Sequence, residues 1–331
     1  MADLEKRKLR PLFVAQYLAQ NADDTTAVTT TEILDQLERE HGISSDRKSI
    51  YRDIALLRDH FGMDIQTATD AKGYYLMSRQ FEMDDLFLIA ECINAAKFVS
   101  EKRSAEMIDI LCEFCSKHQA YSLKSRRPCS RVKTTQDSTL RTISTIRHAM
   151  QDTYRFQTAQ ISFQYLTHSL DNPHLLIEKH DGKTYTVFPV QLLINGGNYY
   201  MLAYDQSGKD LQTFRIDRMS HVTETCERSR YFHISQMESY LQKTFSMYDG
   251  AITKATIQFE NSLFDTVIDK FGPTVPYVRN DEDHFTVTTD IAVSPPFFGW
   301  ICGFGTKAKL LGPMDLVNQF KDYLESIKNI Y

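Results

Sequence analysis

Two arginines near the middle of the chain could bind an anion. Arg215 and Arg218 closely follow a tyrosine-rich run, residues 199–204. Guanidinium groups donate planar, bidentate hydrogen bonds to phosphates and carboxylates, so the pair beside tyrosine hydroxyls predicts an anion-recognition surface. A second interpretation is that Arg215 pairs with Asp217 or Asp205 and only stabilises the fold. The spacing alone leaves both interpretations open.

Short strands must position these arginines. A glycine pair at 196–197 separates two apolar, β-prone runs, which predicts a tight hairpin turn. The next run, residues 211–216, predicts a third strand. Side chains alternate along a strand, so Arg215 and Asp217 are expected on one face. That leaves Arg218 as the freer arginine and the better candidate for a phosphate.

The same region resembles the WYL domain of bacterial transcriptional regulators. The resemblance rests on residues 161–165, 187–192, 199–201 and 213–219. Tyr-Tyr-Met at 199–201 stands where the family has Trp-Tyr-Leu, and the Phe-Arg-x-Asp-Arg segment matches fully. The resemblance implies a small SH3- or Sm-like β-barrel that senses a nucleotide or a nucleic acid fragment. It implies these ligand-binding residues: Ser162, Tyr165, Tyr200, Arg215 and Arg218.

A helix-turn-helix pattern opens the chain. Apolar residues recur at helical spacing over residues 8–20, 29–41 and 47–61, with cap candidates at residues 29–31 and 44–46. Two β-prone runs follow, joined by a turn that contains a lysine. Helix, short turn and helix form the unit that places a second helix in the major groove of DNA.

The third of these helices begins with basic and polar residues. They lie largely off its apolar face, as recognition residues do. The segment 47–54 with the hairpin behind it resembles the winged helix-turn-helix of WYL regulators, which implies double-stranded operator DNA as a partner. The alternative is a solvated basic helix on an unrelated all-α domain. The predicted DNA-binding residues are Arg47, Lys48, Ser49, Tyr51, Arg52 and Lys72.

Three amphipathic helical patterns follow, over residues 84–100, 104–118 and 138–152. They are predicted to separate the winged helix-turn-helix from the WYL region and to form a homodimer contact. The polar, basic stretch 117–133 reads as a solvated linker, with nucleic acid contact as the alternative. Cys112 and Cys115 have the spacing of a redox or zinc pair, but no second pair accompanies them, which favours a core-facing arrangement.

The predicted fold class is a multidomain α+β chain. Residues 251–331 alternate strands and helices in an order compatible with a ferredoxin-like layer, and resemble the C-terminal extension behind WYL domains. The predicted domains are a winged helix-turn-helix at 1–80, a helical linker at 81–152, the WYL barrel at 153–235 and the C-terminal extension at 236–331.

Composition narrows the functional class. The 331 residues are 42% apolar with a net charge of −5, which predicts a soluble, cytoplasmic protein with its basic residues localised rather than general. The sequence has no apolar run of about 18 residues and no leader, so neither a membrane span nor export is expected. No nucleotide-binding or hydrolase motif is present. We therefore expect no enzymatic activity, no cofactor and no metal.

These observations favour a DNA-binding transcriptional regulator, a homodimer whose WYL domain binds a ligand and modulates operator binding. The alternative is an accessory interaction module that the winged helix tethers to DNA without effector sensing. A regulator should bind a discrete palindromic or repeated site, whereas a tether should bind DNA without sequence preference and with strong dependence on salt.

Overall fold

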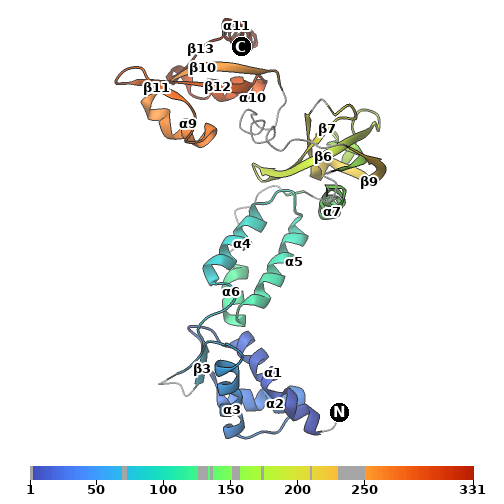
Figure 1. The fold of residues 1–331 in the computed structure, drawn as a ribbon, viewed down its shortest axis with the longest axis vertical. Helices are drawn as coiled ribbons and strands as arrows, with labels where there is room; N and C mark the ends of the chain where they lie inside the picture. The colour runs from blue at the N-terminus through green and yellow to red at the C-terminus, as the bar shows by residue number, and fades with distance from the viewer. Residues whose placement is uncertain are drawn as a thin grey trace. The chain divides into compact units, whose positions relative to one another are not determined.

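The computed structural model describes residues 3–68, 73–125, 133–134, 137–150, 157–172, 175–208, 211–229 and 250–331. The chain divides into two compact units, residues 1–138 and 139–331 (Figure 1). Helices and antiparallel sheets occur in both units, which confirms the predicted α+β class. None of the described helices is long and apolar enough to cross a membrane.

Three helices and a small antiparallel sheet begin the first unit. The sheet has the order β1-β3-β2. The predicted helices and the two hairpin strands are present. Strand β1 was not predicted, because a strand of two residues is too short to show an alternating pattern of apolar and polar side chains. The bounds are α1 (Asp3–Asn21), β1 (Val28–Thr29), α2 (Thr30–His41), α3 (Arg47–Asp59), β2 (Ile65–Thr67) and β3 (Gly73–Leu76).

Local signals fix the ends of α2 and α3. Thr29 and Glu32 form a reciprocal capping box, with the Glu32 N–H 3.2 Å from Thr29 Oγ1 and the Thr29 N–H 2.6 Å from Glu32 Oε2. Gly42 ends α2 in the left-handed conformation, with φ of 62°. Asp46 caps α3 by accepting the Ser49 N–H at 2.8 Å. Of the cap candidates predicted at residues 29–31 and 44–46, the structure uses Thr29 and Asp46.

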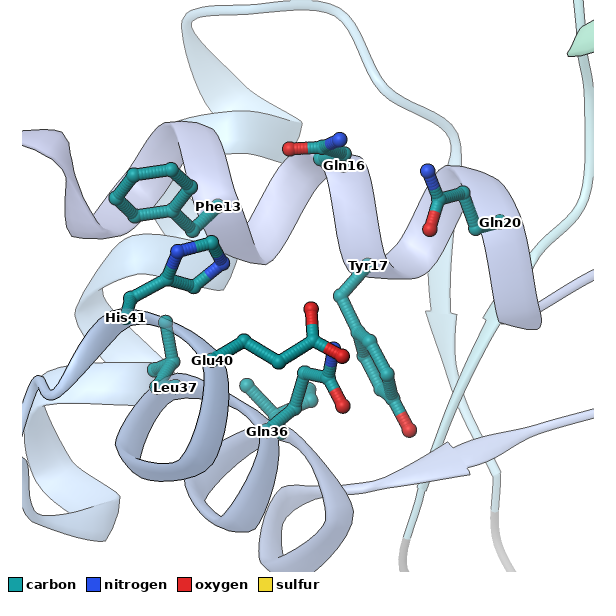
Figure 2. Close-up of a pocket in the computed structure, with 9 residues that line it drawn as sticks. Phe13, Gln16, Tyr17, Gln20, Gln36, Leu37, Glu40 and His41 are labelled. Atoms are coloured by element: carbon teal, nitrogen blue, oxygen red, sulfur yellow. The ribbon is translucent and has the colours of Figure 1, made fainter.

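A small pocket lies between α1 and α2 (Figure 2). The rings of Phe13 and His41 stack across it with centroids 3.7 Å apart. Its volume of about 50 Å³ is enough for one or two water molecules and too small for a nucleotide. We therefore treat it as a packing feature of the helix pair.

Helices α4 (Met83–Ala95), α5 (Glu101–Leu111) and α6 (Lys117–Ser125) complete the first unit, with the short 3₁₀ helix η1 (Cys112–Phe114) between α5 and α6. Residues 117–125 were predicted as solvated linker and are helical instead. Ser116 and Gln119 exchange capping hydrogen bonds at 3.2 and 3.0 Å, and Leu123 packs into the core that also contains Cys115. Weak periodicity over nine residues concealed this helix.

Lys133 was also predicted as a solvated linker residue and is not. Its ammonium group donates to the carbonyl oxygens of Ile93 and Ala96, each at 3.1 Å, and to the hydroxyl of Ser104 at 2.7 Å. It thereby satisfies acceptors at the C-terminal end of α4, where carbonyl groups lack helical partners. Burial lowers the pKa of Lys133.

A polar junction joins the N-terminal three-helix region to α6. Asp23 is fully buried and accepts hydrogen bonds from Thr25, Thr26 and the Ser116 hydroxyl. The guanidinium of Arg79 donates to the carbonyl oxygen of Ala22. Burial alone would raise the pKa of Asp23, but these hydrogen bonds lower it to about 2. A buried, ionised and fully bonded carboxylate therefore fixes this junction.

The second unit begins with α7 (Thr139–Met150) and a six-stranded antiparallel sheet. Ile143, Ile146 and Ala149 form the buried face of α7. The strands are β4 (Ala159–His168), β5 (Leu176–Glu178), β6 (Thr184–Asn195), β7 (Asn198–Tyr204), β8 (Leu211–Arg215) and β9 (Met219–Arg228).

The predicted hairpin is present, because Asn195 pairs with Asn198 around the glycine turn. The predicted barrel is not closed within the described residues. The sheet runs β5-β4-β6-β7-β8, and β9 pairs with β4 rather than with β8. The cause is local: β8 ends at Arg215, and the 3₁₀ helix η2 (Ile216–Arg218) turns the chain away. The strand predicted over 211–216 is therefore one residue too long.

The C-terminal layer occupies residues 250–331. Its sheet has the order β11-β12-β10-β13, all antiparallel, and the chain order βαββαβ followed by a helix is that of the predicted ferredoxin-like layer. Its core is rich in phenylalanine. The elements are β10 (Ile252–Glu260), α9 (Phe264–Phe271), β11 (Tyr277–Arg279), β12 (His284–Ala292), α10 (Pro295–Cys302), β13 (Ala308–Gly312) and α11 (Met314–Lys328).

Candidate functional site

The hydroxyl of Tyr165 is the meeting point of the candidate ligand residues. It accepts the backbone N–H of Arg215 at 3.0 Å, which covers the outer edge of β8. Pairing of β7 with β8 places Tyr200 directly opposite Arg215. Burial raises the pKa of Tyr165, and the Arg215 N–H together with the charges of Arg218 and Arg215 opposes that rise. Both guanidiniums therefore act electrostatically on this hydroxyl.

Arg215 is held by a carboxylate. Its Nε lies 3.0 Å from Asp217 Oδ1, and its Nη2 lies 2.6 Å from Asp217 Oδ2. The 3₁₀ helix η2 makes this possible, because it folds Asp217 back beside the end of β8. Burial alone would lower the pKa of Arg215, but Asp217 raises it above its usual value. The charge of Arg215 is thus largely balanced inside the fold.

Arg218 differs from Arg215. Its Nε is buried, and within the described parts of the chain it has no hydrogen-bond partner. A buried, unsatisfied N–H costs free energy unless a ligand or water accepts from it. Arg218 therefore keeps an unused donor among the described residues, whereas Nε and Nη2 of Arg215 are both engaged.

Four aromatic rings pack beside the arginines, namely Phe163, Tyr165, Tyr185 and Phe214. Ring centroids are 5.1 Å apart for Phe163 and Phe214 and 6.2 Å apart for Tyr165 and Tyr185. Most of the pairs are edge-to-face, the arrangement that aromatic quadrupoles favour. Strand register explains the group, since β4 pairs Phe163 with Tyr185 of β6.

Further cations surround these rings. Lys179 Nζ lies 5.9 Å from the centre of the Tyr165 ring, and Lys183 Nζ lies 5.3 Å from that of Tyr185. His180 Nδ1 is 2.6 Å from the Tyr185 hydroxyl. We call the four rings with Lys179, Lys183, Arg215 and Arg218 the aromatic–basic cluster.

Sequence analysis missed Tyr185 and its basic neighbours. They precede or begin β6, outside the tyrosine-rich run and the Phe-Arg-x-Asp-Arg segment. Only the register between β4 and β6 brings them to Tyr165. The sequence did contain a signal: Lys179, Lys183 and Tyr185 flank a turn that includes a glycine. In the structure this turn has φ values of 55°, 54° and 73° at residues 180–182.

Ser162 does not join the cluster. Its hydroxyl lies 2.9 Å from Thr223 Oγ1 of β9, and the strand period puts it on the face of β4 opposite to Phe163 and Tyr165. The structure thus brings together four of the five predicted ligand residues.

The second candidate surface is on α3. Arg47, Lys48 and Arg52 are exposed, and Tyr51 is 50% exposed. None of the three basic residues forms an ion pair with any residue that the structure describes. Ser49 is partly engaged, because its hydroxyl lies 3.3 Å from Asp46 Oδ2. The predicted residue Lys72 lies outside the described residues.

The acidic residues of α3 are neutralised away from this surface. Asp53 faces away from this surface and pairs with Arg10 of α1, at 2.6 and 3.2 Å. Asp53 is 5% exposed, so the pair tethers α1 to the inner side of α3. Asp59 lies 2.8 Å from Arg58. Arg47, Lys48 and Arg52 therefore form a positive surface at the N-terminal half of α3, where the carboxylate of the N-cap Asp46 interacts electrostatically with Arg52.

Metal ligands do not gather in the described residues, where no group of three or more histidine, cysteine, aspartate or glutamate side chains could hold an ion. Cys112 and Cys115 are free thiols, and burial raises the pKa of each. Inert, partly buried thiols fit the core-facing interpretation of this pair.

Comparisons with known proteins give one informative match. The WYL domain family matches residues 142–224, which includes most of α7 and every residue of the aromatic–basic cluster. A comparison with curated protein sequences found no match.

Among the solved structures that match, two align over nearly the whole chain with low TM-scores. One is the proteasome accessory factor B/C (PafBC) of Arthrobacter aurescens, with 13% identity, coverage of 99% of this chain and 54% of that chain, and a TM-score of 0.29. This chain thus spans about half the length of that protein. The other is a CRISPR Cas-related protein, with 11% identity, coverage of 99% and 84%, and a TM-score of 0.35. The family match shows that residues 142–224 form a WYL domain.

Proposed function

We propose that the protein is a transcriptional regulator whose N-terminal region binds operator DNA and whose WYL domain binds a phosphate-bearing ligand. The observation that carries the proposal is the pair of basic regions on one chain. One is the basic start of α3, and the other is the aromatic–basic cluster of the WYL domain. Their chemistries suit two different nucleic acid ligands.

The N-terminal region is proposed to be a winged helix, with α3 as its recognition helix. Ile50, Ile54 and Leu57 bury the inner face of α3, so the basic residues at its start point to solvent. Recognition helices contact bases with such N-terminal residues, while helix N-termini and basic side chains contact phosphates. With a net charge of −5 for the chain, this positive surface is a local feature.

The WYL ligand is proposed to be a nucleotide or a short single-stranded nucleic acid. Arg218 supplies the anion donor, since Arg215 is held by Asp217. The rings of Tyr165 and Tyr185 supply apolar faces, and exposed Lys179 and Lys183 add positive charge. Aromatic stacking combined with a basic surface is how proteins hold unpaired bases and their phosphates.

The polar junction at Asp23 gives the N-terminal region a fixed attachment to the helices that follow it. Hydrogen bonds from Ser116 to Asp23 and from Gln119 to Asp24 transmit any movement of α6 to the loop between α1 and α2. The size of a ligand response is limited by the ligand's differential affinity for the two states.

The test is selection of genomic DNA fragments by the full chain, at two salt concentrations, followed by sequencing. The proposal predicts enrichment of a small set of sites that share a palindromic or repeated sequence. A matched selection with the Lys48→Ala/Arg52→Ala variant should lose this enrichment. Uniform recovery of fragments with strong salt dependence would favour the accessory tether instead.

A further inference from the structure

A groove in the C-terminal layer runs along the edge of a strand. It has a volume of about 710 Å³, which lies within the range of ligand and peptide sites. Its lining is mostly apolar and comes from the end of α10, from β13 and from one stripe of α11. The lining residues of β13 are Ala308, Lys309, Leu310 and Leu311, and those of α11 are Val317, Phe320, Lys321 and Leu324.

The groove must follow the strand edge rather than either face of the sheet. Successive side chains of a strand point to opposite faces, yet four consecutive residues of β13 line this one cavity. Only the edge is reached from both faces. Residues 317, 320, 321 and 324 have the spacing of one helix face, so α11 forms the opposite wall.

Among the described residues, the backbone of that edge pairs on one side only. β13 is the last strand of the sheet and pairs with β10 on one side only. Within residues 250–331, which the structure describes continuously, no backbone hydrogen bond joins the outer side of β13 to α11 or to any loop. An open edge of this kind is a template for another strand.

The apolar wall is also uncovered. Leu311 is 40% exposed and Leu324 is 42% exposed, although both face the groove. Leu316 near the start of α11 is buried, whereas Leu324 and Ile327 in its later turns are exposed. Apolar surface left open beside a free strand edge indicates an interaction site.

The charges of the groove select its occupant. Lys309 and Lys321 are the charged residues of the lining, and neither forms an ion pair with a described residue. Lys307 nearby is already paired with Glu260 at 3.3 Å. A second copy of the same edge would bring lysine against lysine, whereas an acidic partner would be attracted.

We propose that this groove binds an extended peptide segment of another protein by strand addition to β13. The segment carries apolar side chains at alternate positions, which enter between β13 and α11, and acidic residues that meet Lys309 and Lys321. Main-chain hydrogen bonds to the open edge provide affinity, and the apolar contacts with Leu311, Phe320 and Leu324 provide specificity.

The experiment is selection of a displayed random-peptide library on the immobilised full chain, followed by anisotropy titration of the enriched peptides. The expected result is enrichment of sequences with alternating apolar residues and at least one acidic residue. Leu324→Glu and Lys309→Glu/Lys321→Glu should each lose most of the binding. Val278→Glu is the matched control, because Val278 is 67% exposed on β11, the opposite edge strand of the same sheet.

Strand addition has a second signature in the peptide. Methylation of alternate backbone nitrogens should weaken binding about tenfold or more in one register and leave it nearly unchanged in the other, because only alternate N–H groups face β13. Failure to enrich any peptide over the Leu324→Glu variant would overturn the proposal. So would equal loss in both registers, or self-association of the chain that the groove variants abolish.

Discussion

Arg215 and Asp217 form a two-point ion pair at the end of β8, with nitrogen–oxygen distances of 3.0 and 2.6 Å. Asp217 is 8% exposed, so its carboxylate has little contact with solvent. Arg218, the next residue, has a buried Nε without a partner among the described residues. Two arginines three positions apart therefore differ: Arg215 is engaged by Asp217, and the Nε of Arg218 has no partner among the described residues.

Arg215→Ala should lower the stability of the WYL domain. The substitution leaves the Asp217 carboxylate buried without its cation, which costs about 3 kcal/mol after allowance for the partial exposure of Arg215. Chemical denaturation followed by circular dichroism measures this change. Arg218→Ala is the matched control and should cost less than about 1 kcal/mol, because it strands no buried charge. Equal losses for both variants would contradict the division of roles.

Lys48→Ala and Arg52→Ala should weaken DNA binding without affecting folding. Both side chains are exposed on a helix whose buried face is elsewhere. If Lys48 contacts a guanine edge, its loss should cost ~1–3 kcal/mol at one position of the site. If it contacts phosphate, the loss should be uniform across sequences with a smaller salt slope. Anisotropy titrations of selected fragments distinguish these outcomes.

Arg58→Ala is the control for these variants. Arg58 lies in the last turn of the same helix and pairs with Asp59 at 2.8 Å. Its removal should leave DNA affinity within about twofold, which is less than 0.5 kcal/mol. Unchanged binding of the Lys48 and Arg52 variants would remove α3 from the recognition role.

Acid should weaken the junction at Asp23. Its folded pKa is lowered from 3.8 to about 2, so its stabilising contribution is fully present above pH 4 and is lost as the pH falls toward 2. The shift corresponds to about 2 kcal/mol. Denaturation of the wild type and of Asp23→Asn between pH 5 and pH 2.5 should show a steeper decline for the wild type. Parallel curves would show that Asp23 is not the titrating group.

Useful DNA specificity normally requires two half-sites, so we predict a homodimer. The helices α4 and α5 or the C-terminal layer are the expected contacts. Exposed apolar residues on the helices, among them Leu88 at 62% and Ile110 at 49%, are suitable for the first of these. Sedimentation at tens of micromolar should show a dimer, and a monomer with and without DNA would contradict the prediction.

The sequence was informative wherever a local signal determined the structure. The cap candidates at residues 29–31 and 44–46 predicted the starts of their helices, because a cap satisfies backbone groups within a few residues. The glycine pair at 196–197 predicted its hairpin, because glycine allows the backbone conformation that the turn requires. The pairing of Arg215 with Asp217 was also among the alternatives, since both residues lie in one short segment.

Long-range partners could not be predicted in the same way. The pairing of Asp53 with Arg10 spans 43 residues, and nothing near Asp53 points to α1. Tyr185 reaches Tyr165 only through the register of two strands. The hydrogen bonds of Lys133 are made to carbonyl groups at the end of α4, which come within its reach only when the helices are packed. Register and packing, rather than residue type, decided these cases.

The central claim is that a ligand held by the aromatic–basic cluster changes DNA binding. The most direct measurement is anisotropy of a selected DNA fragment with the full chain, titrated with a short single-stranded oligonucleotide, for the wild type and for Arg218→Ala. We predict that the oligonucleotide shifts the affinity of the wild type for the fragment about fivefold or more, and that Arg218→Ala keeps the basal affinity but loses the shift. No shift in the wild type, or an equal shift in the variant, would contradict the claim.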